Sequence, residues 1–102
     1  MPRSRTITLS LAAILALSAA ANAENAKVTF GTNWLAQAEH GGFYQSVADG
    51  TYAACGLDVT IQPGGPQVNN RALMIAGRVD YHMGGNLLEA FSAVQEGIPI
   101  VA

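Results

Sequence analysis

The segment that decides the fold starts with Leu57-Asp58-Val59-Thr60-Ile61. It continues with Pro63-Gly64-Gly65-Pro66 and a helical stretch that ends at Gly77. Its first five residues alternate apolar and polar side chains, which predicts a strand with one buried face. The Pro and Gly residues predict a turn into a helix whose apolar side chains recur at helical spacing. A glycine suits the end of that helix, because the residue after a helix often adopts the left-handed conformation.

The same unit of strand, loop and helix occurs on both sides of this segment. Before it lie an alternating strand over residues 27–32 and a helical stretch over 42–54. After it lie a weaker strand over 79–83, a helix over 86–96 and the start of a fourth strand over 98–101. Strands that alternate with helices of this length predict an α/β fold with a parallel sheet and right-handed crossovers. A chain that stops beside a strand is expected to be part of a longer protein.

Each helix has an apolar stripe that we expect to be buried against the sheet. The stripes comprise Phe43, Val47 and Ala54, then Val68, Ala72, Ile75 and Ala76, and finally Leu87, Phe91 and Val94. Asn86 is expected to cap the last helix while Glu89 reaches back. Cys55, the single cysteine, can form no disulfide within the chain, and we expect it to be a small buried apolar residue.

The first 23 residues have the pattern of a secretory signal peptide. Arg3 and Arg5 precede an apolar run over residues 7–21, and Ala21-Asn22-Ala23 provides small residues for cleavage after Ala23. The run is shorter than the roughly 20 residues that a membrane-spanning helix needs. The sequence therefore predicts a signal peptide over 1–23 and a soluble, exported product over 24–102.

The chain after Ala23 carries three basic residues against seven acidic ones, a net charge of −4. A nucleic-acid-binding domain needs a clustered basic face, so we expect no nucleic-acid partner. The sequence contains no nucleophile elbow, zinc-protease motif, cysteine pair or phosphate-binding loop, and we expect neither a metal nor a cofactor.

The loops that follow the strands of a parallel sheet meet at one edge, where such folds bind ligands. Trp34 could stack on a planar ligand or close the core, and His40 could bond a ligand or lie at the surface. Tyr44 could reach the same crevice or pack, and the glycine pairs could expose main-chain amides or only make turns. The candidate ligand-binding residues are Asn33, Trp34, His40, Tyr44, Gly64, Gly65, Gly84, Gly85 and Asn86.

Other charged or titratable side chains are expected to serve the fold. Alternation places His82 opposite Tyr81 and Met83 as an interior or edge histidine. Asp58 and Asp80 lie near strand starts, where they would be solvated or capping groups. Arg71 and Arg78 could reach an anion only if their helix turned them toward the crevice.

A family resemblance rests on the run from Asn33-Trp34 through Glu39-His40-Gly41-Gly42-Phe43-Tyr44, followed by Gly50-Thr51-Tyr52, Gly56-Leu57-Asp58-Val59 and Pro63-Gly64-Gly65-Pro66. The chain resembles the substrate-binding proteins for thiamine pyrimidine precursors, sulfonates and nitrate, a family that also contains the fungal thiamine pyrimidine synthase. The resemblance implies that residues 24–102 are the N-terminal part of the first lobe of a substrate-binding domain with a periplasmic-binding-protein type II fold. It also implies a monomeric periplasmic receptor that closes on a small molecule and docks on the membrane permease of an ABC importer.

Two alternatives remain at this point. The resemblance admits an enzyme like the synthase, in which His40 would act with pyridoxal phosphate, although an exported chain would leave the compartment of that cofactor. A truncated, non-functional reading frame is the other possibility.

Overall fold

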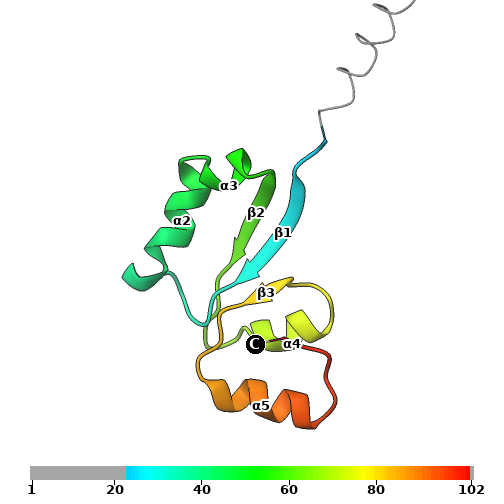
Figure 1. The fold of residues 1–102 in the computed structure, drawn as a ribbon. Coiled ribbons are helices and arrows are strands. Elements are labelled where there is room, and N and C mark those ends of the chain that lie inside the picture. Colours follow the sequence, from blue (N-terminus) through cyan, green and yellow to red (C-terminus); the bar gives the residue numbers. More distant parts are fainter. Residues whose placement is uncertain (1–22, 102) are drawn as a thin grey trace, which may run out of the picture.

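The computed structural model describes residues 23–101, so the predicted signal peptide lies outside the described residues except for Ala23. The elements follow in the order β1 (Ala26–Gly31), the short 3-10 helix η2 (Ala38–His40), α2 (Gly41–Ala48), α3 (Thr51–Ala54), β2 (Leu57–Gln62), α4 (Asn70–Ile75), β3 (Tyr81–His82) and α5 (Leu87–Gln95). Strands and helices alternate as the sequence predicts (Figure 1).

The three strands form one parallel sheet in the order β2-β1-β3. β1 pairs with β2 along its whole length, from Ala26 opposite Leu57 to Gly31 opposite Gln62. It pairs with β3 only at its carboxyl end, where Phe30 and Gly31 face Tyr81 and His82. The predicted α/β fold with a parallel sheet is therefore confirmed.

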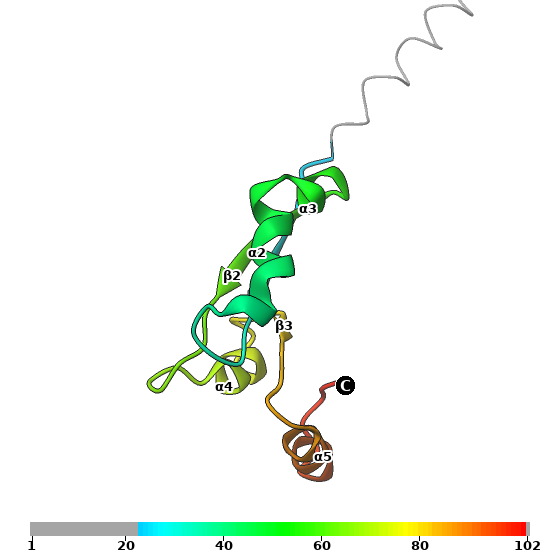
Figure 2. The same ribbon diagram turned by 90° about the vertical axis from the view of Figure 1, so that its left-hand side faces the viewer.

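The helices are spread along the sheet (Figure 2). α2 and α3 pack beside β2, and the Phe43 ring of α2 lies 4.6 Å from the Phe30 ring of β1, centroid to centroid. α4 lies next to β3, and α5 lies beyond it without substantial contact to another helix or strand of residues 23–101. The strands thus bring their carboxyl ends together between α2 and α4.

Three predicted elements differ from those observed. The helical stretch over 42–54 is two helices, because Asp49 and Gly50 interrupt it and Gly50 adopts a φ of 81°. The third strand has only two residues, since the Asp80 carboxylate accepts the Thr29 amide just before β3 starts. Residues 98–101 are not a strand: the Ile98 amide donates to Ala93 and the Ile100 amide to Ile98.

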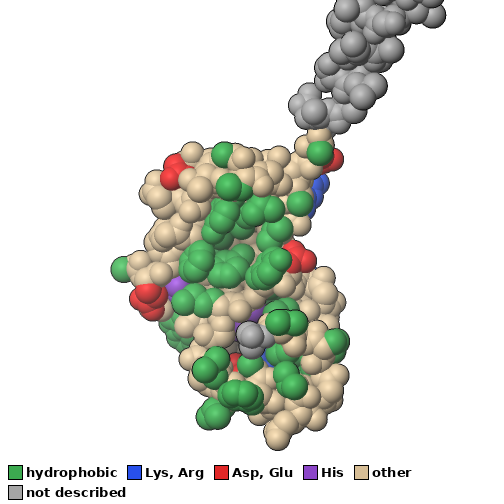
Figure 3. Space-filling view, in the orientation of Figure 1, with side chains coloured by type: hydrophobic (Ala, Val, Ile, Leu, Met, Phe, Trp, Pro, Cys, Tyr) green, Lys and Arg blue, Asp and Glu red, His purple; other side chains and the backbone are tan. Residues whose placement is uncertain are grey.

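The expected burial of the helix stripes is wrong for several residues. Leu87, Phe91 and Val94 of α5 are 71%, 65% and 58% exposed, because α5 turns its small Ala90 and Ala93 side toward the protein. The side chains from the other stripes that are also exposed are Val47, Ala54, Val68, Ala72, Ile75 and Ala76. Apolar side chains gather at the surface over β1 and β2 beside α2, and again over α5 (Figure 3).

The interior is small and partly polar. The buried apolar residues within 23–101 are Val79 and Ala93, and the buried polar ones are Thr32, His40 and Asn70. Cys55 is exposed, which corrects the prediction of a buried thiol: it follows the short helix α3 at a surface turn. The buried polar residues all lie near the carboxyl ends of β1 and β2, where the candidate site is found.

Candidate functional site

An open cavity of about 780 Å³ lies at the carboxyl edge of the sheet. It is bounded by the loop after β1, the loop between β2 and α4, the start of α4, and the segment from β3 to α5. Its lining residues are Thr32, Asn33, Trp34, Gln37, Pro66, Gln67, Val68, Asn69, Asn70, Arg71, His82, Gly85 and Glu89. The predicted meeting of the three loops at one edge is therefore observed.

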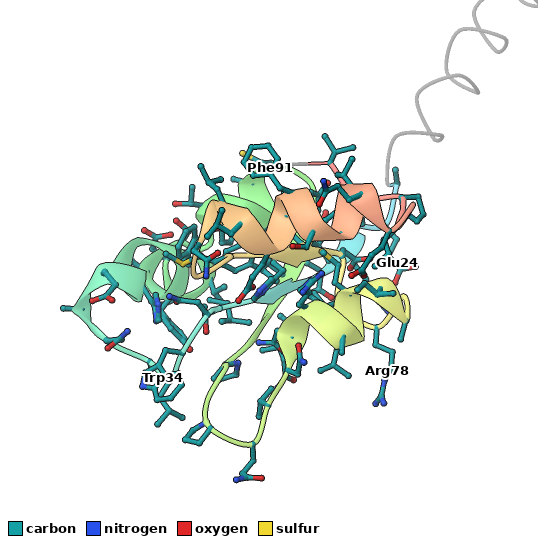
Figure 4. All side chains as sticks on the ribbon, turned by 90° about the horizontal axis from the view of Figure 1, so that it is seen from below. Glu24, Trp34, Arg78 and Phe91 are labelled. Atoms are coloured by element: carbon teal, nitrogen blue, oxygen red, sulfur yellow. The ribbon has the colours of Figure 1, made fainter. Side chains whose placement is uncertain are left out.

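Trp34 stands at the mouth of this cavity. Its side chain is 45% exposed and projects from the loop after β1 (Figure 4). An indole in this position offers a flat apolar face against which a planar ligand can stack. The alternative prediction, that Trp34 closes the core, does not agree with its exposure.

Gly64 joins two of the loops and does not face the cavity. Its amide donates to the Trp34 carbonyl at 3.1 Å and to the Thr32 hydroxyl at 3.2 Å, so it is not free for a ligand. A Cβ at Gly64 would lie 2.6 Å from the Thr32 carbonyl oxygen and 2.7 Å from the Asn33 carbonyl carbon. The predicted role of Gly64 in presenting an amide is therefore wrong: glycine is needed here because the two loops touch. Gly65 does not line the cavity either, and its carbonyl accepts the Val68 amide.

His40 lies behind the cavity wall. It is fully buried, which excludes the predicted surface position, and its Nε2 lies 2.9 Å from Asn33 Oδ1. Asn33 itself lines the cavity. In this arrangement His40 contacts the site through Asn33. Tyr44 is half-buried on α2, does not line the cavity, and its hydroxyl has no hydrogen-bond partner within residues 23–101.

Asn70 is a buried polar residue of the cavity wall. It is 3% exposed, and its Nδ2 donates to the carbonyls of Thr32 and Gln62, both at 3.0 Å. These bonds tie the first residue of α4 to the ends of β1 and β2. Nothing in the spacing of the sequence singled this asparagine out, because its partners lie 38 and 8 residues away.

A second, more apolar cavity of about 930 Å³ adjoins the first on the side of α5. Gly84, Gly85 and Asn86 line it, and Gly85 also lines the first cavity. The Asn86 carboxamide caps α5 by accepting the Glu89 amide at 3.2 Å, which confirms the predicted cap, whereas no bond from the Glu89 carboxylate back to Asn86 is present among residues 23–101. Its Oδ1 is thus engaged in the cap.

Two side chains that are not among the predicted ligand-binding residues lie at the boundary between the cavities. Arg71 and His82 line both of them, and Arg71 Nε and His82 Nδ1 are buried without a hydrogen-bond partner in the described part of the chain. α4 therefore turns Arg71 toward the crevice, which is the orientation that contact with an anion requires. Arg78 lines neither cavity and projects away from the protein (Figure 4).

The described residues show neither a metal centre nor a membrane span. No three histidine, cysteine or acidic side chains among them are grouped as a metal site would require. None of the helices over residues 23–101 combines the length and apolar character needed to cross a bilayer.

A parallel α/β lobe with an open polar cavity at the carboxyl edge of its strands is the architecture of a small-molecule-binding protein. The family model described as NMT1/THI5 like matches residues 37–102. The chain therefore belongs to the NMT1/THI5-like family, as the resemblance implied, and its three-stranded sheet agrees with a periplasmic-binding-protein-like lobe. This membership supports a general substrate-binding role. No curated protein and no solved structure matches the chain.

Proposed function

We propose that the protein is a periplasmic solute receptor that binds a small heteroaromatic or anionic nutrient and delivers it to the membrane permease of an ABC importer. The observation that carries the proposal is the cavity where Trp34, Asn33 and Arg71 converge at the carboxyl edge of the sheet. An aromatic face beside a few fixed polar groups is typical of small-ligand sites. Family membership and the predicted signal peptide support the same function.

Ligand binding is tested with the fluorescence of the full chain, whose single tryptophan stands at the cavity mouth. Pyrimidine, sulfonate, nitrate and flavin compounds are titrated, and saturable quenching is expected for one class. A Trp34→Phe variant keeps an aromatic face but loses the indole signal, so calorimetry on it distinguishes stacking from an indirect change of emission. Absence of a saturable response to all four classes would contradict the proposal.

Export is tested separately by fractionating bacteria that express the chain. The expected result is a periplasmic product whose mass corresponds to a start at Glu24. A product that keeps residues 1–23 would contradict the exported receptor. Light scattering of the purified product checks the proposed monomeric state.

The enzyme alternative receives no geometric support. A histidine that reacts with a substrate or with pyridoxal phosphate must be accessible, whereas His40 is fully buried and its Nε2 is held by Asn33. The receptor remains the function that the cavity favours.

A further inference from the structure

The orientation of the Asn70 carboxamide leaves an acceptor without a protein partner. Both hydrogens of Nδ2 are taken by the Thr32 and Gln62 carbonyls, so a flipped amide would place Oδ1 against two carbonyl oxygens. Oδ1 is therefore fixed, and it is buried without a hydrogen-bond partner in residues 23–101. A buried acceptor without a partner destabilises the protein, and a donor from a bound molecule would remove that cost.

The side chains that line the same cavity as Asn70 include a donor. Arg71 follows it on α4 and presents a buried Nε without a partner in the described chain, as His82 does with Nδ1. Glu89 lines the same cavity and adds a second acceptor. A pocket built for a bare oxyanion would point donors at the ligand. Here the Arg71 donor is accompanied by two acceptors, Asn70 Oδ1 and the Glu89 carboxylate.

We infer that this wall, defined as Asn70, Arg71, His82 and Glu89, binds a ligand group in which an N–H donor lies beside an acceptor atom, as in a primary carboxamide. The ligand N–H donates to Asn70 Oδ1, and the adjacent acceptor receives the Arg71 Nε–H. A nitrate, sulfonate or carboxylate oxygen would place an acceptor against Asn70 Oδ1. The inference rests on the proposed function and selects among its ligand classes.

The test uses a matched pair of probes, nicotinamide and nicotinate, which share a ring and differ in the group presented. Both are titrated into the isotope-labelled full chain, followed by the backbone and arginine Nε–H resonances; potassium nitrate is a third probe. Nicotinamide is expected to bind at least tenfold more tightly than nicotinate and to shift the Arg71 Nε–H resonance. The Arg78 resonance is the internal control, because Arg78 lines neither cavity.

An Arg71→Met variant keeps the aliphatic stem and removes the donor, and Arg78→Met is its matched control. Nicotinamide affinity is expected to fall about tenfold in the first variant and to stay unchanged in the second. Substitution of Asn70 is avoided, since it would also cut the tie between β1 and β2.

The outcomes separate this inference from the receptor proposal. Nicotinate or nitrate binding as tightly as nicotinamide would overturn the donor–acceptor wall and leave a receptor for anions. Binding of nicotinamide with equal affinity to the Arg71→Met and Arg78→Met variants would also overturn it. If nicotinamide, nicotinate and nitrate all fail to bind, and no pyrimidine, sulfonate, nitrate or flavin compound binds either, the receptor proposal fails. This inference then fails with it.

Discussion

Replacement of Gly64 by alanine tests whether contact between the loops holds the cavity edge together. The added Cβ would lie 2.6–2.8 Å from main-chain atoms of Thr32 and Asn33, a distance that requires the backbone to move. Movement weakens the two bonds from the Gly64 amide, each worth about 1 kcal/mol, and adds strain of about 1–3 kcal/mol. We expect Gly64→Ala to lower the free energy of unfolding by about 2–4 kcal/mol.

That loss is large for this fold. At about 0.05–0.15 kcal/mol per residue, the residues from 23 to 101 would be stable by roughly 4–12 kcal/mol. Urea denaturation followed by circular dichroism measures the change, and Trp34 fluorescence reports the neighbouring loop. Gly42→Ala is the matched control: Gly42 lies in α2, nothing lies within 4 Å of its added Cβ, and alanine should stabilise the helix by up to about 1 kcal/mol. Equal stability of the two variants would refute the reasoning.

Three further predictions concern side chains around the site and on α3. His40→Ala should destabilise the protein by about 2 kcal/mol or more in urea denaturation, because it leaves a buried void. It should also weaken ligand binding, because it removes the hydrogen-bond partner of Asn33. Unchanged binding would contradict a role of His40 in positioning Asn33. The Thr51 hydroxyl, and then its amide, hold the pKa of Asp49 below its ordinary value by bonding the carboxylate. This stabilisation is present above the unfolded pKa of about 4 and is lost as the pH falls through the folded pKa. The protection of the Thr51 amide, meaning its exchange rate relative to the intrinsic rate at the same pH, should therefore fall on acidification, and Asp49→Asn should remove that dependence. Cys55 should react with a thiol reagent in the native protein about as fast as in urea, because it is exposed; strong protection would contradict the structure.

The sequence was a good guide to elements that depend on local chemistry. Alternation located β1 and β2, and the capping asparagine located the start of α5. It was a poor guide to burial, which depends on the elements that lie nearby. The apolar stripe of α5 implies burial only if another element covers it, and within 23–101 none covers Phe91 (Figure 4). The periodicity of the sequence shows which face of a helix can be buried. Whether that face is buried depends on another helix or strand that packs against it.

The candidate site shows the same division. The parallel sheet made it possible to expect Asn33, Trp34 and Gly85 at one edge, and all three line the first cavity. Gly64 was predicted to present its amide to a ligand, whereas it is a glycine because the two loops are in contact there. The sequence could not distinguish the two roles, because a glycine pair is compatible with both. Arg71 was left undecided, since its direction depends on where α4 begins.

Polar residues, more than apolar ones, fix this edge of the sheet. Thr32, His40 and Asn70 are three of the five buried residues that are not glycine, and each bonds a loop or strand end that borders the cavity. Buried polar bonds are directional, so they hold a geometry more strictly than the contact of two aliphatic side chains. A substitution at any of the three should therefore change stability and ligand affinity together. Phe91 and Val94 at the surface of α5 should affect neither, because they line neither cavity and border no bond of this network.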